Sequence, residues 1–204
     1  AYLRDPSAPL DADAQKGMAL FYGAAGCSTC HAGAFQTDHG FHAMGAPQLG
    51  PGKAAVFETH TRDTGRMGVT GNGADAYAFR TPSLRNVMQT GPWGHAGGHS
   101  QIEKFLRDHM DPARAAKRFA PGAADRNGVR LPPLDGDDWR EMDDPAARDA
   151  ITQAAMIRAP KGLNPGDIAA LVSFLRSLDD PQALSGRLGI PDTVPSGLAV
   201  GGAP

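Results

Sequence analysis

Apolar residues recur at helical spacing near the start of the chain, over residues 12–22. This stretch begins with polar residues and gathers its apolar ones near its end, where Gly23 and Gly26 stop the pattern. A period near 3.6 residues that ends at glycine is typical of an amphipathic helix. We therefore predict a helix over residues 12–22 that leads directly into residues 27–31.

A second helical pattern covers residues 100–110, where the apolar positions are Ile102, Phe105 and Leu106. These positions follow the i, i+3, i+4 spacing of one buried face, and Ser100 is the expected N-cap. The helix is expected to end at Asp111, because the residue before a proline is biased away from helical backbone angles.

The clearest helix is predicted after residues 164–167, which read NPGD. Proline just inside a helix start is favourable, and the residues that follow form a wide apolar stripe. The stripe comprises Ile168, Leu171, Val172, Phe174, Leu175 and Leu178.

The remaining segments show no sustained period and are rich in glycine and proline. Residues 32–81, residues 119–138 and the tail after Leu178 are predicted as loops, the last as an extended strap over the surface. The chain contains 26 Gly and 17 Pro in 204 residues, which favours helices separated by long loops over a tightly packed bundle.

Charge and hydropathy exclude several classes of partner. The net charge of −2 gives no general affinity for nucleic acid or for an anionic membrane surface. No run of about 18 apolar residues is present, so no membrane span is expected. The chain begins at Ala1 without a signal segment, from which we expect a processed or trimmed piece.

The two cysteines of the chain both lie in residues 27–31, Cys27-Ser28-Thr29-Cys30-His31. The spacing C-x-x-C-H is the attachment signal of one c-type haem. Two thiols two residues apart can form thioethers to one porphyrin, and the adjacent imidazole can ligate the iron. A redox dithiol is the alternative, but the histidine and the lack of a surrounding βαβ pattern argue against it. Covalent haem attachment predicts a periplasmic location.

The ligand on the other side of the iron decides between electron transfer and chemistry at an open site. The candidates are His39, His42, His60, His95, His99 and His109, with Met44, Met67, Met88 and Met110. His109 falls near the centre of the apolar face of residues 102–106, where a polar ring needs a partner. Iron and a backbone carbonyl are equally compatible with this spacing, and Met110 is the fallback ligand.

Several motifs resemble the carboxy-terminal haem domain of the bacterial di-haem cytochrome c peroxidase and MauG family. Residues 79–87 read FRTPSLRNV and residues 90–98 read TGPWGHAGG, where the family reads F-x-x-P-S-L-R-N-V and T-x-P-Y-x-H-x-G. Further matches are the approach to C-x-x-C-H, FQTD at 35–38, DTGR at 63–66 and VPSGL at 194–198. The resemblance covers nearly the whole chain.

The resemblance implies a sixth iron ligand fourteen positions beyond His95, which is His109. Peroxidases of the family commonly have Met there and MauG-like members have Tyr, so histidine departs from both patterns. A bis-imidazole, low-spin iron with a lower potential than a His/Met centre is therefore expected, with His/Met through Met110 as second choice.

Other roles also follow from the resemblance. Thr90 and Pro92 match family positions that hold a structural Ca²⁺ together with an asparagine from the other haem domain; an ordinary turn is the alternative. Arg80 and Arg85 are candidates for the haem propionates or for plain salt bridges. Trp93 is a weaker candidate for electron passage near the domain junction, since packing is the commoner role.

The predicted fold is mainly α, a cytochrome c-like haem domain with three or four principal helices, long loops and a short hairpin. Residues 1–10 are expected to be an interdomain linker remnant, residues 11–180 the c-type haem domain and residues 181–204 an extended C-terminal tail. The family carries a second C-x-x-C-H in an amino-terminal domain, and the single motif here indicates a fragment, a nicked chain or a single-haem derivative.

The sequence thus predicts electron transfer through a six-coordinate haem, as half of a peroxidase or MauG-like oxidoreductase. The expected partners are an amino-terminal haem domain and a redox protein. Two alternatives stay open. In the first, the lone haem reduces H₂O₂ at an open or displaceable sixth site, with His95 or His99 assisting proton transfer. In the second, the chain is a free-standing electron carrier.

Overall fold

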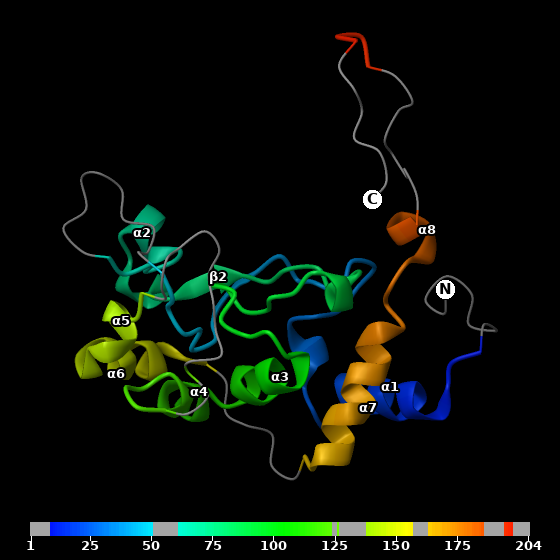
Figure 1. Ribbon diagram of the computed structural model, residues 1–204, viewed down its shortest axis with the longest axis horizontal. Coiled ribbons are helices and arrows are strands. Elements are labelled where there is room, and N and C mark those ends of the chain that lie inside the picture. Colours follow the sequence, from blue (N-terminus) through cyan, green and yellow to red (C-terminus); the bar gives the residue numbers. More distant parts are fainter. Residues whose placement is uncertain are drawn as a thin grey trace.

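The computed structural model describes residues 9–50, 61–123, 126, 138–156, 163–185 and 194–197. The fold is mainly helical, as predicted, and it contains one small sheet (Figure 1). No helix among these residues is long and apolar enough to cross a membrane. Residues 1–8 of the expected linker remnant at residues 1–10, the candidate His60 and most of residues 119–138 lie outside the described residues.

The helices are α1 (Ala12–Tyr22), α2 (Met67–Thr70), α3 (Ile102–Met110), α4 (Pro112–Arg118), α5 (Arg140–Asp143), α6 (Pro145–Ala154), α7 (Pro165–Arg176) and α8 (Pro181–Ser185). The strands are β1 (Phe41–Ala43) and β2 (Ala78–Arg80). Short 3₁₀ turns are η1 (Cys27–Thr29), η2 (Gly73–Asp75) and η3 (Val87–Gln89).

Helices α1 and α7 pack against each other and form the first core (Figure 1). Phe21 of α1 contacts Phe174 of α7 at a ring-centroid distance of 5.0 Å, and both side chains are buried. Both helices are capped at their N-termini. Asp11 accepts a hydrogen bond from the Ala14 amide at 2.7 Å, and Asn164 forms a capping box with Asp167. This pair provides a rigid base for the segment that follows α1.

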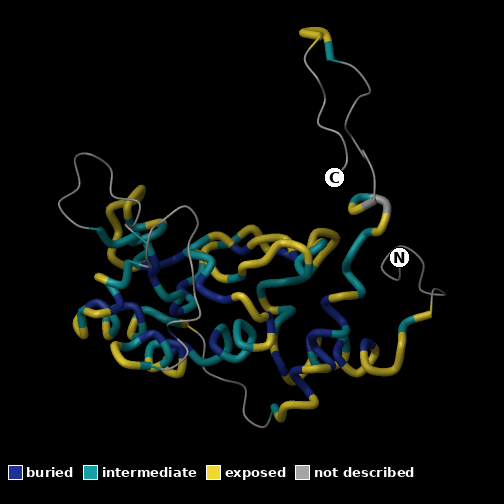
Figure 2. The backbone as a smooth tube through the Cα atoms, viewed as in Figure 1, coloured by how far each residue is buried: buried dark blue, intermediate teal, exposed yellow. Residues whose placement is uncertain are grey.

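A second core lies at the other end of the molecule, beside α4, α5 and α6 (Figure 1 and Figure 2). Its buried members are Leu49, Tyr77, Phe119, Met142 and Ile151. Helix α3 lies between the two regions and contacts both α4 and α7 (Figure 1). Movement of α3 would therefore disturb the packing on both of its sides.

The sheet joins two distant parts of the first long loop region. Strands β1 and β2 are antiparallel, with His42 opposite Phe79 in the register. The pairing continues where the Thr81 amide donates to the Gly40 carbonyl at 2.9 Å. More than thirty residues separate the strands, so the expected short hairpin is wrong, and the sheet instead ties residues 37–43 to residues 78–81.

Three local predictions differ from the structure. Gln101, not Ser100, precedes α3 and gives no side-chain cap. Helices α2, α4, α5 and α6 were not predicted, and α2 lies within residues 32–81, which were expected to be a loop. Helix α8 occupies residues 181–185 of the tail that was expected to be extended, while residues 186–193 and 198–204 lie outside the described residues.

Candidate haem-binding site

The C-x-x-C-H motif folds as a tight turn immediately after α1. Gly26 enters this turn with a φ of +67°, a left-handed conformation that glycine adopts at little cost. The amides of Cys30 and His31 both donate to the Cys27 carbonyl, at 3.3 and 2.9 Å. The turn brings the two thiols and the imidazole into one compact segment anchored to α1.

The two cysteines do not form a disulfide and both are half-buried. Burial raises the pKa of Cys27 to about 11, and burial together with the negative charge of Asp38 raises the pKa of Cys30. Reactive redox dithiols instead have depressed pKa values, because the thiolate is the nucleophile. These thiols are therefore unsuited to thioredoxin-like exchange, which weakens the alternative interpretation of the motif.

The imidazole of His31 is oriented by the backbone of the next loop. Its Nδ1 lies 3.1 Å from the Gln36 carbonyl oxygen, an arrangement in which Nδ1–H donates and Nε2 keeps its lone pair. Gln36 is itself fixed, because its buried side-chain amide donates to the Tyr22 hydroxyl at 3.1 Å and to the Gly33 carbonyl at 3.3 Å. Such a bond orients a metal-ligating histidine and increases its basicity.

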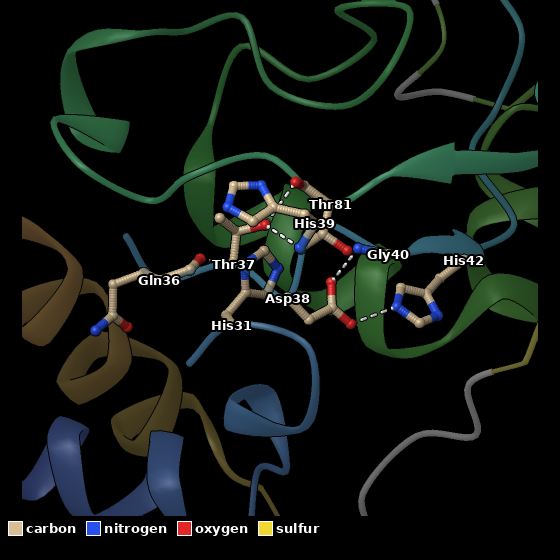
Figure 3. Close-up of polar contacts among 8 residues, drawn as sticks. All are labelled: His31, Gln36, Thr37, Asp38, His39, Gly40, His42 and Thr81. Carbon is tan, nitrogen blue, oxygen red and sulfur yellow. Dashed lines mark hydrogen bonds and ion pairs between the residues drawn. The ribbon is translucent and has the colours of Figure 1, made fainter. Parts of the chain in front are cut away.

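Hydrogen bonds hold residues 37–42 in place around the motif (Figure 3). The Thr37 hydroxyl donates to the Thr81 carbonyl at 2.7 Å, and the Asp38 amide donates to the Cys30 carbonyl at 2.8 Å. The Asp38 carboxylate accepts from the Gly40 amide at 2.8 Å and pairs with His42 at 2.7 Å. The hydrogen bond from His42 is the main reason that the pKa of Asp38 falls to about 2.

Replacing Asp38 with asparagine is expected to remove an acid-dependent part of the stability. A carboxyl whose pKa is lower in the folded chain than its ordinary value of 3.8 stabilises the fold above pH 4, and that contribution is lost as the pH falls towards 2. The wild type should therefore be more stable than Asp38→Asn at pH 7, with a difference that shrinks between about pH 4 and pH 2. Urea unfolding at several pH values measures this, and a pH-independent difference would contradict it.

His109, near the end of α3, lies close to His31. The two ring centroids are 6.5 Å apart and the ring planes are inclined by 49°. A metal–imidazole bond is about 2 Å long and each ring centre lies roughly 1 Å behind its bonding nitrogen, so two rings on one ion have centres about 6 Å apart. The separation of His31 and His109 is close to that value.

Electrostatics also suit His109 to metal binding. Burial, with smaller contributions from His31 and His99, lowers the pKa of His109 to about 4. The ring is therefore neutral at pH 7 and offers a nitrogen lone pair. Its neighbour Met110 instead packs against the first core, beside α7.

The other described histidines have partners of their own. His39 lies 3.1 Å from the Arg80 guanidinium and His42 pairs with Asp38. His95 pairs with Asp63 at 2.8 Å and stacks on Phe79, and buried His99 pairs with Asp108 at 3.0 Å. Among the methionines, Met88 packs against the first core and Met67 begins α2.

The arginines lie near the loop that follows the motif. Arg85 donates to the Ala34 carbonyl at 3.1 Å and its guanidinium covers the Phe35 ring, while Arg80 contacts His39. Both arginines are exposed, and among the described residues neither forms a salt bridge with a carboxylate. Their assignment to propionates stays a prediction.

The predicted calcium positions and Trp93 lie in the loop after η3. The Thr90 hydroxyl donates to the Val87 carbonyl at 3.1 Å, Pro92 is exposed, and the Trp93 indole donates to the same Val87 carbonyl at 2.8 Å. These contacts are those of an ordinary loop turn, so the calcium role and the electron-passage role stay predictions.

The residues present fit a c-type haem by the chemistry of their donors. Two adjacent thiols, one imidazole with a free Nε2 and a second neutral imidazole at a matching distance form the donor set that such a group needs. Cys30, Asp38 and His42 also lie within 4.8 Å of one another, but Cys30 belongs to the attachment motif. The sequence matches the family at FQTD, residues 35–38, but no signal in it predicts the contacts that Gln36 and Asp38 make.

Comparison with known proteins places this geometry in context. The chain matches no protein-family model. It is 30% identical over 185 residues to cytochrome-c peroxidase IdrP1 of Denitromonas iodatirespirans, covering 81% of this chain and 47% of that protein. It is 42% identical over 110 residues to the methylamine utilization protein MauG of Methylorubrum extorquens, covering 52% of this chain and 27% of that protein. The chain thus spans about half or less of the length of these relatives.

Solved structures with the same fold are also di-haem proteins or their relatives. A MauG-like protein associated with microbial copper homeostasis superposes with a TM-score of 0.54 at 23% identity, over 88% of this chain and 50% of that one. The diheme peroxidase BthA of Burkholderia thailandensis gives 0.55 at 22% identity, over 86% of this chain and 44% of that one.

The fold is therefore that of a MauG-like di-haem peroxidase domain. The chain belongs to the bacterial di-haem cytochrome c peroxidase and MauG family, and its relatives imply a c-type haem.

Proposed function

We propose that this chain transfers electrons through one six-coordinate c-type haem. In this proposal Cys27 and Cys30 anchor the porphyrin, and His31 and His109 ligate the iron. The observation that carries it is the 6.5 Å separation of the His31 and His109 imidazole rings beside the attachment motif. A bound c-type haem supplies a metal that changes its charge by one electron.

Each residue has a defined task. The Gln36 carbonyl holds the Nδ1 proton of His31, so that Nε2 of His31 is the ligating atom. His109 stays neutral at physiological pH and occupies the position that water or peroxide would need. Two imidazole ligands favour a potential below that of a His/Met centre. The chain's residues therefore favour electron relay over peroxide chemistry.

We also propose that the chain acts as the carboxy-terminal half of a larger di-haem oxidoreductase. Support comes from the order of the motifs at 79–87 and 90–98 and from coverage of about half of the relatives' length. An amino-terminal haem domain, a redox partner protein and a periplasmic location belong to this proposal. So does a Ca²⁺ site through Thr90 and Pro92 that the other domain would complete.

Replacing His109 with alanine tests the proposal. The ferric wild type is expected to show a low-spin visible spectrum, and His109→Ala should give a high-spin spectrum because the sixth position opens. Added imidazole should restore the low-spin spectrum, since it replaces the lost ring. Absorption and electron paramagnetic resonance spectroscopy, with a pyridine haemochrome count of one haem per chain, measure these outcomes.

The matched control is Met110→Ala, one residue further along α3. It should lower the stability, because Met110 packs against the first core, and leave the low-spin spectrum intact. A spectrum that responds to Met110→Ala and not to His109→Ala would assign the ligand to Met110. A high-spin wild type that turns over H₂O₂ would instead favour the single-haem peroxidase.

A further inference from the structure

A buried ionic cluster is centred on the residue that precedes the proposed iron ligand in α3. Its centre is Asp108, whose residue is 2% exposed and whose carboxylate contacts His99 at 3.0 Å and Arg118 at 2.6 Å. Arg114 approaches the second carboxylate oxygen at 3.5 Å. His99 comes from the loop before α3 and the two arginines come from α4, so the cluster joins three consecutive segments through one side chain.

The cluster is costly in free energy. Burying charges carries a large desolvation penalty, and a buried ion pair often contributes little to net stability compared with an apolar replacement. Within the described residues, Nδ1 of His99 lacks a hydrogen-bond partner although that residue is only 4% exposed. An expensive cluster of this kind is better explained by conformational specificity than by stability.

The position of the cluster indicates which conformation it specifies. Asp108 precedes His109 in the last turn of α3, where backbone groups lack intrahelical partners and helices tend to fray. Phe105 contacts both rings, with centroid distances of 5.4 Å to His99 and 4.9 Å to His109. The His99 ring also meets the Phe119 ring at 5.3 Å. The last turn of α3 is thus held by side chains of the preceding loop and of α4.

We propose that Asp108, with His99 and Arg118, forms a clamp that positions His109 opposite His31 and keeps the sixth iron position closed. This inference rests on the proposed function, because it needs His109 as the ligand. Asp108 and His99 are positioning residues, since they act through His109 and do not contact the iron. Loss of the clamp frees the last turn of α3 and lets external ligands compete with His109.

The test compares the full chain, loaded with haem, with its Asp108→Asn and His99→Phe variants. Asp108→Asn removes the charge at constant size, and His99→Phe keeps an aromatic ring between Phe105 and Phe119. Both should raise the high-spin fraction of the ferric spectrum. Cyanide should bind to Asp108→Asn at least about tenfold faster than to the wild type, because His109 must leave before cyanide can enter.

The matched control is Glu141→Gln on α5, which breaks a partly buried ion pair with Arg62 (3.2 Å) far along the chain from the haem motif. It should lower the melting temperature without changing spin state or cyanide rate. If Asp108→Asn does not fold, His99→Phe decides the outcome, since Asp108 keeps its arginine partners in that variant.

The outcomes separate the two proposals. A response to His109→Ala without any response to Asp108→Asn or His99→Phe overturns the clamp and leaves the ligand assignment standing. A spectrum that ignores His109→Ala overturns the proposed function itself. Equal cyanide binding rates in Glu141→Gln and Asp108→Asn, both faster than in the wild type, would show that a loss of stability alone speeds cyanide binding. That result would also overturn the clamp.

Discussion

Replacing Cys27 and Cys30 together with serine is expected to give a chain from which acid–acetone extracts all of the haem. Serine keeps the approximate size of the thiol, so the turn held by the Cys27 carbonyl should persist. Only the two imidazole bonds of His31 and His109 would then retain the porphyrin, and acid protonates both rings and breaks those bonds. The wild type should keep its haem through the thioethers under the same treatment.

The single variants are the controls for this prediction. Cys27→Ser and Cys30→Ser should each keep one thioether and so retain haem through acid–acetone treatment. The pyridine haemochrome band should shift stepwise from wild type to single to double variant, because each lost thioether leaves one vinyl group unsaturated. Haem that stays attached in the double variant would show that the motif is not the attachment site.

Helices α1 and α7 were predictable because local signals agree with one another. Residues 12–22 combine an apolar period with a glycine stop, and Asn164 with Asp167 forms the capping box that its sequence allows. Helices α4 and α6 were missed for one common reason. Asp111-Pro112 was interpreted only as a helix end, and Asp144-Pro145 was not considered. An aspartate at the N-cap followed by proline as the first helical residue also starts a helix.

The features of the site also divide into those that the sequence predicts and those that only the folded structure shows. Cys27, Cys30 and His31 are contiguous, so their spacing alone carries the chemistry. The contact of His31 with the Gln36 carbonyl and the pairing of Asp108 with His99 depend on loop conformations and tertiary packing. No periodicity signals either contact. His109 became a candidate from its place on the apolar face of a predicted helix, where iron and a backbone carbonyl stayed equally open, and the family resemblance favoured iron.

Helix α1 links the fold to the haem-binding site, because only four residues separate its end at Tyr22 from Cys27. Its position depends on how closely it approaches α7. At Gly17 an added Cβ would lie 1.9 Å from the Ala170 carbonyl oxygen and 2.9 Å from the Phe174 Cβ. Both obstacles are fixed parts of α7, so rotation of a flexible side chain cannot relieve the contact.

Replacing Gly17 with alanine is therefore expected to destabilise the fold by at least about 3 kcal/mol, although alanine is the better helix former by about 1 kcal/mol. Since domains of this kind are stable by only about 5–15 kcal/mol, a large part of the chain should be unfolded well below the wild-type melting temperature. Gly68→Ala in α2 is the control, because its nearest neighbour is the Thr64 hydroxyl at 3.5 Å. That control should change stability by less than about 1 kcal/mol. Urea unfolding followed by circular dichroism compares the two variants, and equal midpoints would mean that α1 and α7 do not meet at Gly17.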